Sequence, residues 1–288
     1  MKTKNVLSAS RRTDIPAFYM DWFISCLARG HFDVCNPFSN KVKILYASPE
    51  DIHSIVFWSK NYGHLLESKD HLREYNLFFH FTLNTFVPKL EPGLSPLDER
   101  LEQAKALSRW RGADRLMWRF DPVVLWEEEG KRSNNLSGFH YIAKSLRRIG
   151  IERLTLSMMD RYAKIEKRIH GLPAFRFIYP DKEEAAGILG TLAEDALDMG
   201  FEVSFCCEKE LLELLPSLPV RQGRCIDGEL LTRLFGAGAD LSPDRGQRRG
   251  QGCGCTVSID VGSYSRQPCL NNCLYCYANP AVTATVVP

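Results

Sequence analysis

Three cysteines near the C-terminus have a spacing that lets them wrap around one metal centre. Residues 269–276 read CLNNCLYC, so Cys269, Cys273 and Cys276 form a CxxxCxxC pattern. Thiolates are soft, strongly donating ligands that suit iron-sulfur clusters or zinc, and three of them can occupy three corners of a 4Fe-4S cube. The fourth iron of such a cube is free to bind a substrate. The pattern therefore predicts a 4Fe-4S cluster at these cysteines.

Zinc is the alternative at this loop, because a structural zinc site closes with four ligands and Cys253 or Cys255 could complete it. The uneven placement of the cysteines favours ligation over packing, since five of the ten fall between residues 253 and 276. Disulfides are rare in the cytoplasm. We expect a cytoplasmic protein, because residues 1–8 lack the apolar core of a secretory signal.

A second group of cysteines has the ligand number of another metal site. Cys206 and Cys225 stand apart in the sequence, and Cys253 and Cys255 form a CxC pair shortly before the loop. Four thiolates are what a second, closed 4Fe-4S cluster or a zinc site needs. The alternative is that Cys206, Cys207 and Cys225 are small core residues and that the CxC pair merely lies near the first cluster.

At the CxxxCxxC loop the chain resembles the radical S-adenosylmethionine superfamily, whose pattern has an aromatic residue before the last cysteine. Tyr275 fills that position, and the string CLNNCLYCYANP is similar to the cluster loops of that superfamily. The resemblance implies a partial (β/α)6 barrel and a cluster bound by Cys269, Cys273 and Cys276. It also implies that S-adenosylmethionine binds the fourth iron and is cleaved reductively to a 5'-deoxyadenosyl radical.

The order of the motifs differs from that superfamily. Its members place the loop directly after the first strand, whereas here the loop closes the sequence. Residues 58–61, after the second expected strand, read WSKN where the superfamily has Gly-Gly-Glu. The whole pattern, from SRRTDIPAFY through FWSKN and RFDPV to CGC and CLYCYAN, resembles a bacterial family of domains of unknown function (DUF1848).

The elements that must position these residues alternate between strands and helices. Apolar runs predict strands at 6–10, 52–60, 77–84, 116–121, 154–157 and 201–208, with a seventh at 175–179. Helical spacing follows at 20–29, 98–110, 136–149 and 182–199. Such alternation implies parallel strands with right-handed crossovers. The fold class is therefore α/β.

Side-chain parity favours a barrel over a flat sheet. In 77–84 and 201–208 one face is apolar, with Phe79, Phe81 and Phe205, while the other carries residues such as His80 and Ser204. Polar residues on one face of a parallel sheet suit a lumen that holds a ligand. We expect a partial (β/α) barrel of about six parallel strands over residues 1–240. A cluster-binding segment, 241–288, would pack on the mouth of this barrel.

Several charged residues lie where the rim of such a barrel is expected. Arg11 and Arg12, with Asp14, follow the first strand and suit an anionic ligand, or Asp14 and an arginine brace the turn. Arg119 and Asp121 lie two apart on one strand face, either as ligand-binding groups or as a structural ion pair. The candidate catalytic residues are Arg11, Arg12, Asp14, Arg119, Asp121 and Glu208, and the candidate cofactor-binding residues are Lys60 and Asn84.

The composition is that of a globular protein without a strong overall charge. Lys and Arg total 37 against 35 acidic residues. This balance gives the protein no overall positive potential that would attract polyanions. The basic stretch 244–250 could still contact a nucleic acid. The sequence contains no apolar run that could span a bilayer.

We expect a radical S-adenosylmethionine-type enzyme, reduced by a ferredoxin or flavodoxin, that acts on a small molecule. The alternative is a non-enzymatic iron-sulfur or zinc protein with a structural or electron-transfer role.

Overall fold

Eight parallel strands form the main sheet of the protein. The computed structural model describes residues 3–36, 39 and 41–278. The strand order is β12-β11-β9-β6-β5-β4-β1-β13, and all neighbours are parallel. The strands are β1 (Asn5–Ala9), β4 (Ile52–Ser59), β5 (Leu77–Thr82), β6 (Leu116–Val123), β9 (Arg153–Met158), β11 (Glu202–Phe205), β12 (Arg221–Gln222) and β13 (Ile259–Asp260). Six of them correspond to the predicted strands and lie in chain order, and the short β12 and β13 form the edges.

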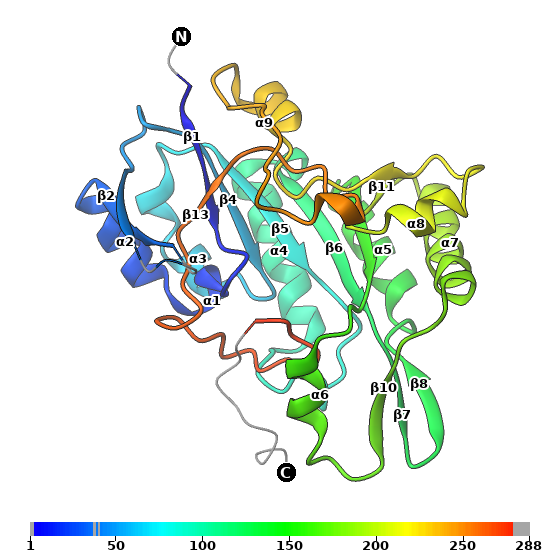
Figure 1. Cartoon of the computed structure of the whole chain (residues 1–288). Coiled ribbons are helices and arrows are strands. Elements are labelled where there is room, and N and C mark those ends of the chain that lie inside the picture. Colours follow the sequence, from blue (N-terminus) through cyan, green and yellow to red (C-terminus); the bar gives the residue numbers. More distant parts are fainter. Residues whose placement is uncertain (1–2, 37–38, 40, 279–288) are drawn as a thin grey trace.

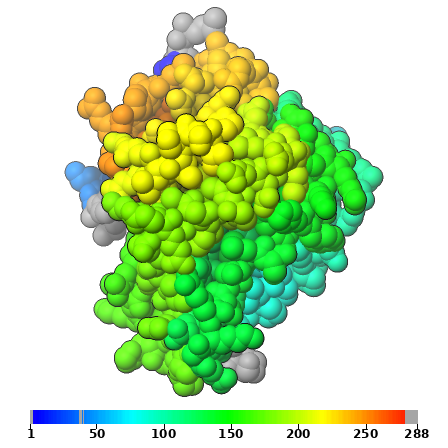
Figure 2. Space-filling view, turned by 90° about the vertical axis from the view of Figure 1, so that its right-hand side faces the viewer, coloured from blue at the N-terminus to red at the C-terminus, as the bar shows by residue number. Residues whose placement is uncertain are grey.

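Helices join the strands and pack on the sheet (Figure 1). They are α1 (Ile15–Phe18), α2 (Met20–Ala28), α3 (Gly63–Glu67), α4 (Leu97–Arg111), α5 (Phe139–Arg148), α6 (Ala163–Ile169), α7 (Lys182–Asp198), α8 (Lys209–Glu213) and α9 (Gly228–Phe235), with 3-10 helices at Lys69–Leu72, Ala113–Arg115 and Arg249–Gln251. The four predicted helices correspond to α2, α4, α5 and α7. Figure 2 shows the side of the molecule where the segments around α7 and α8 meet the green segments that include α5.

Two small antiparallel sheets interrupt the alternation of strands and helices. The hairpin β7 (Leu125–Glu128) and β8 (Lys131–Asn134) follows β6, and β10 (Phe175–Ile178) pairs with β7. The seventh predicted strand is therefore present as β10 but belongs to this separate sheet. The second small sheet pairs β2 (His31–Cys35) with β3 (Val42–Tyr46). Sequence reasoning predicted neither hairpin.

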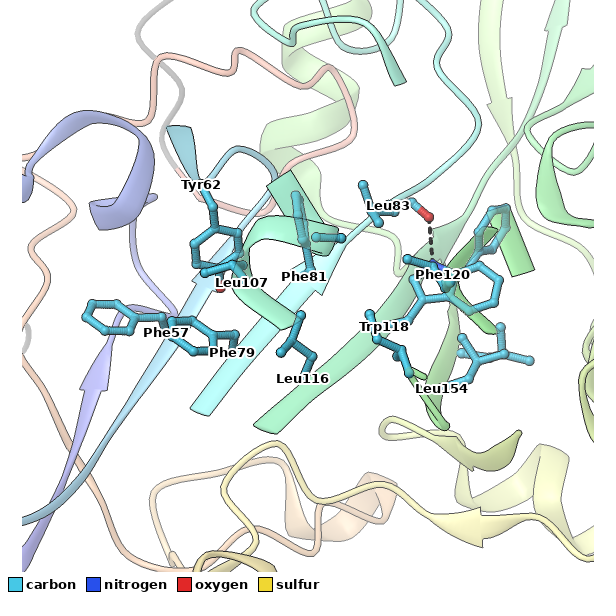
Figure 3. Close-up of a cluster of buried hydrophobic side chains, with 14 of the residues drawn as sticks. Phe57, Tyr62, Phe79, Phe81, Leu83, Leu107, Leu116, Trp118, Phe120 and Leu154 are labelled. Carbon is cyan, nitrogen blue, oxygen red and sulfur yellow. Dashed lines mark hydrogen bonds between the residues drawn. The ribbon is translucent and has the colours of Figure 1, made fainter. Parts of the chain in front are cut away.

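The apolar face of the strands packs against the helices as parity predicts. Phe79 and Phe81 of β5 and Leu83 after it are buried with Trp118 of β6 and Phe139 of α5 in the main core (Figure 3). The indole of Trp118 donates a hydrogen bond to the carbonyl oxygen of Leu83 over 2.9 Å. This bond satisfies both buried polar groups, so the aromatic core fixes β5 beside β6.

The opposite face of the sheet has an apolar part, which packs on a helix, and a polar part. Toward the start of the strands, Val56 and Phe78 pack against Leu230 and Leu231 of α9. Further along the strands this face carries polar side chains, among them Arg119. No helix in the part of the chain that the structure describes is long and apolar enough to cross a membrane.

Candidate functional site

The cysteine loop lies at the carboxyl end of the parallel strands, although it comes last in the sequence. Strand β13 pairs with β1, so the C-terminal part of the chain returns to the edge of the sheet that holds the first strand. The red segment after β13 then crosses below the strand ends (Figure 1). The Tyr19 hydroxyl donates to the carbonyl oxygen of Pro268 over 2.6 Å, and the Tyr277 hydroxyl donates to that of Arg11 over 2.6 Å. The loop is thereby tied to the segment that follows β1.

Backbone contacts with the segment after β5 hold the centre of the loop. The Leu274 N–H donates to Leu90 O over 2.9 Å, and the Gly93 N–H donates to Asn271 O over 3.1 Å. A Cβ atom at Gly93 would stand 2.3 Å from Leu270 O. Only glycine permits this approach, so the loop and this segment fit together as backbone against backbone.

Arg168 of α6 closes the loop from the other side. One guanidinium nitrogen, Nη1, lies 3.3 Å from Cys273 O, 2.6 Å from Leu274 O and 2.9 Å from Cys276 O. These carbonyls belong to a turn that is part of no helix or strand, where only Cys273 O also accepts a backbone hydrogen bond among the described residues, from the Cys276 N–H over 3.1 Å. The arginine therefore fixes the turn that carries two of the three cysteines.

The three thiols of the loop lie near one another, with Cys273 buried and Cys269 and Cys276 partly buried. Burial, together with the neighbouring Asp14 and Cys276, raises the pKa of Cys269 to about 12. Burial likewise raises the pKa of Cys273 and of Cys276, and Lys60 opposes this effect at both thiols. A bound metal would deprotonate such thiols, because its charge is the largest in the site.

Asp14 links the loop to the start of the sheet. Its carboxylate accepts hydrogen bonds from the Ser59 hydroxyl over 2.6 Å, from the Lys60 N–H over 3.1 Å and from Asn271 Nδ2 over 2.8 Å. It also caps α1. The sequence predicts Asp14 as a catalytic residue or as the partner of an arginine in the turn. In the structure its carboxylate instead contacts Ser59, Lys60 and Asn271, and its catalytic role stays a prediction.

A buried polar network joins the loop to the strand ends. Lys60, directly after β4, donates to Glu91 over 2.7 Å and to the Tyr275 hydroxyl over 2.9 Å. The Tyr275 hydroxyl also donates to Glu91 and lies 3.3 Å from Asn84 Nδ2. Lys60 and Asn84, the candidate cofactor-binding residues, are therefore both at the loop. Sequence reasoning missed Glu91, whose position in a Pro-rich segment gave no pattern.

Several buried polar atoms around the loop have no hydrogen-bonding partner within the described residues. They are Thr13 Oγ1, Glu91 Oε2, Asn271 Oδ1, Asn272 Oδ1 and both terminal nitrogens of Arg100. Arg100 is fully buried in α4, and the charges of Glu91 and Cys273 act on it. Sequence reasoning missed Arg100 because an arginine in a helix normally faces solvent. Unpaired buried groups are rare, and each requires an explanation, such as a bound water, ion or other partner.

Arg11 and Arg12 contact the C-terminal segment before the loop. The backbone N–H of Arg11 donates to Asp260 over 2.8 Å, and Arg12 Nη1 donates to Gly262 O over 3.0 Å. Arg11 Nη2 also lies 3.7 Å from Asp244. Both arginines therefore hold β13 and its neighbours against the end of β1.

The remaining candidates lie on the polar face further across the sheet. Arg119 and Asp121 form an ion pair, and the Ser157 hydroxyl donates to Asp121 over 2.5 Å. Glu208 accepts from the Met158 N–H over 2.8 Å. Burial raises the pKa of Glu208 to about 7. The ion pair agrees with both alternatives stated for Arg119 and Asp121.

The second group of cysteines comes together and gains one member. Cys206 Sγ lies 3.6 Å from Cys225 Sγ and 4.0 Å from Cys207 Sγ. Cys225 also interacts with Cys255, and Cys253 interacts with Cys255 and with Cys207. The strand predicted at 201–208 is too long at its end, because β11 ends at Phe205 and Cys207 has a φ of 62°. With this left-handed backbone, the thiol of Cys207 interacts with Cys206 and Cys253.

As the side chains stand, no group of three or more His, Cys, Asp or Glu residues within 3–36, 39 and 41–278 is arranged to hold a single metal ion. The metal centres at both cysteine groups therefore stay predictions.

Comparison with known families identifies the family of this chain but no activity. The family model described as domain of unknown function DUF1848 matches residues 6–278. The chain belongs to this family. The matched range includes both cysteine groups and the polar network that joins the loop to the sheet, so in this chain these features lie within the DUF1848 domain. No curated protein matches the chain.

Proposed function

We propose that this DUF1848 protein binds a 4Fe-4S cluster through Cys269, Cys273 and Cys276 and is a radical S-adenosylmethionine-type enzyme. The observation that carries the proposal is the grouping of three thiols from one loop, one buried and two partly buried, at the carboxyl ends of parallel strands and near unpaired polar atoms. Ligands in open α/β sheets bind at this end of the strands.

The donor set fits a cluster better than a single ion. In a cube each of the three thiolates binds a different iron, so the sulfurs need not converge on one point. Among the described residues, no group of side chains is arranged to hold a single metal ion. That observation does not bear on a cluster, whose ligands bind separate irons. When bound and reduced, the cluster supplies an electron to S-adenosylmethionine. A ferredoxin or flavodoxin would deliver that electron.

The unpaired polar atoms match the amino acid part of S-adenosylmethionine. Glu91 Oε2, Asn271 Oδ1 and Asn272 Oδ1 are acceptors suited to an ammonium group. The free Arg100 nitrogens and Thr13 Oγ1 can donate to a carboxylate. We assign these residues the role that a Gly-Gly-Glu stretch has in the superfamily that the loop resembles.

The permuted position of the loop is compatible with this function. Pairing of β13 with β1 returns the end of the chain to the place where the superfamily has its loop, directly after the first strand. We also propose that the sheet curves into a partial barrel, with the polar face that carries Arg119 and Asp121 lining the substrate space.

Anaerobic reconstitution with iron and sulfide tests the proposal. We expect about four irons per chain, an electron paramagnetic resonance spectrum that changes on addition of S-adenosylmethionine, and 5'-deoxyadenosine after reduction with dithionite. Cys273→Ala should lose the cluster and keep its circular dichroism spectrum, whereas Cys35→Ala, outside both cysteine groups, should bind iron as the wild type does.

A spectrum that S-adenosylmethionine leaves unchanged, with no 5'-deoxyadenosine formed, would favour the non-enzymatic alternative. Equal iron content in Cys273→Ala and the wild type would refute the cluster assignment itself.

A further inference from the structure

Five cysteines form a closed ring of thiols on the polar face, separate from the CxxxCxxC loop. Cys206 Sγ lies 4.0 Å from Cys207 Sγ and 3.6 Å from Cys225 Sγ, and electrostatic interactions link Cys207 to Cys253, Cys253 to Cys255 and Cys255 to Cys225. They come from three segments: the end of β11, the residues after β12, and the stretch before β13.

One sulfur–sulfur separation in the group already suits a thiolate-bound ion. A tetrahedral zinc ion binds sulfur at about 2.3 Å, which places its ligand sulfurs about 3.8 Å from one another. Cys206 Sγ lies 3.6 Å from Cys225 Sγ, close to this value.

Glycines bring the three segments close enough to place the thiols together. A Cβ atom at Gly223 would stand 2.7 Å from Phe205 O and 3.0 Å from Cys206 Cα. A Cβ at Gly254, between the two cysteines of the CxC pair, would stand 2.8 Å from Arg224 Cγ. The Gly254 N–H donates to Gly223 O over 3.3 Å. The backbone segments therefore already lie together, and rotation about the Cα–Cβ bonds is the movement by which the thiols would converge on one ion.

Donor groups beside the ring suit thiolate ligands. Arg119 Nη1 lies 3.0 Å from Cys225 Sγ, and the Ile226 N–H donates to Cys255 Sγ over 3.4 Å. The charge of Arg248 acts on Cys207. Four thiolates around a divalent ion carry a net charge of about −2, which such cations and N–H groups offset in the shell around a metal site.

We propose that this ring is a second metal centre that binds one thiophilic ion of the zinc type. Cys225, Cys253 and Cys255 supply three ligands, and the Cys206–Cys207 pair supplies the fourth. Four thiols release their protons as the ion binds. The proposal does not rest on the function assigned to the CxxxCxxC loop, because the two groups share no cysteine.

Metal analysis of full-length variants tests the proposal. The triple variant Cys269→Ala/Cys273→Ala/Cys276→Ala should hold about one zinc and no iron per chain. The double variant Cys253→Ser/Cys255→Ser should lose the zinc while it keeps the iron of the loop, and Cys35→Ser should keep both metals. Failure of the loop cluster removes iron alone, so the two proposals fail separately.

Two measurements keep the test valid if the double variant does not fold. Loading the triple variant with Co²⁺ should give the absorption of tetrahedral cobalt thiolate, and titration of its thiols with a mercurial should release the zinc. A folded triple variant without metal, or with a disulfide between Cys206 and Cys225, would overturn the proposal. If the triple variant held iron and sulfide instead of zinc, this group would bind a second cluster, and the proposal of a single ion would be wrong.

Discussion

Replacing Gly93 by alanine tests whether contact with the segment after β5 holds the cysteine loop in place. An ideal Cβ at this position would stand 2.3 Å from Leu270 O, 2.8 Å from Asn271 Cα and 2.9 Å from Asn271 C. All three are backbone atoms, so no side-chain rotation relieves the overlap. Non-bonded heavy atoms rest about 3.5 Å apart, so the loop must move by about 1 Å.

The expected effect on iron binding is larger than the effect on stability. Overpacking of this kind costs about 1–3 kcal/mol of unfolding free energy. Metal-ligand distances tolerate only about 0.2 Å, which is far less than the displacement of the loop. We therefore expect Gly93→Ala to remain folded and to lose most of its reconstituted iron.

Gly187→Ala is the matched control, because Gly187 lies exposed in α7 and a Cβ there meets nothing within 4 Å. That substitution should stabilise the helix by about 0.5–1 kcal/mol and leave iron binding unchanged. Both variants would be reconstituted anaerobically, assayed for iron and sulfide, and unfolded in urea. If Gly93→Ala bound as much iron as Gly187→Ala, the close approach would not position the loop.

Three other substitutions probe the groups that surround the loop. Asp14→Asn should destabilise the protein by about 1–3 kcal/mol in urea, because an amide NH2 would face groups that donate to the carboxylate; unchanged stability would contradict this. Arg168→Met should speed the transfer of iron to a chelator, since the substitution removes the nitrogen that contacts three carbonyls of the loop; a wild-type rate would refute it. Lys60→Met should cost about 3–5 kcal/mol, because Glu91 is left buried without its ion-pair partner. Adding Glu91→Gln should recover much of that loss, and no recovery would exclude this cause.

The main strands could be predicted because their side chains alternate between two environments. In β5 and β6 the apolar residues face the helices and the polar ones face the site, so the period of two is visible in the sequence. Strands β12 and β13 have two residues each and are too short to carry any period. Their positions depend on pairing with distant strands, which sequence patterns do not record.

The chemistry of the site could be predicted only where ligand type and spacing are local. The loop cysteines lie within eight residues of sequence, and their proximity follows from that spacing. Glu91 and Arg100 acquire their roles from tertiary contacts that leave them buried, although both residue types usually face solvent. Cys207 joins the ring because β11 stops early, which parity alone could not show.

The two cysteine groups are parts of one polar face rather than separate additions to the fold. Arg119 contacts Cys225 and pairs with Asp121, whose backbone hydrogen-bonds to Asn84. Asn84 in turn contacts the hydroxyl of Tyr275 within the CxxxCxxC loop. This chain of contacts crosses the ends of β6 and β5, the strands that the aromatic core fixes side by side. The core therefore sets the relative position of both groups, and the polar residues between them are the ones that a substrate bound on this face would meet.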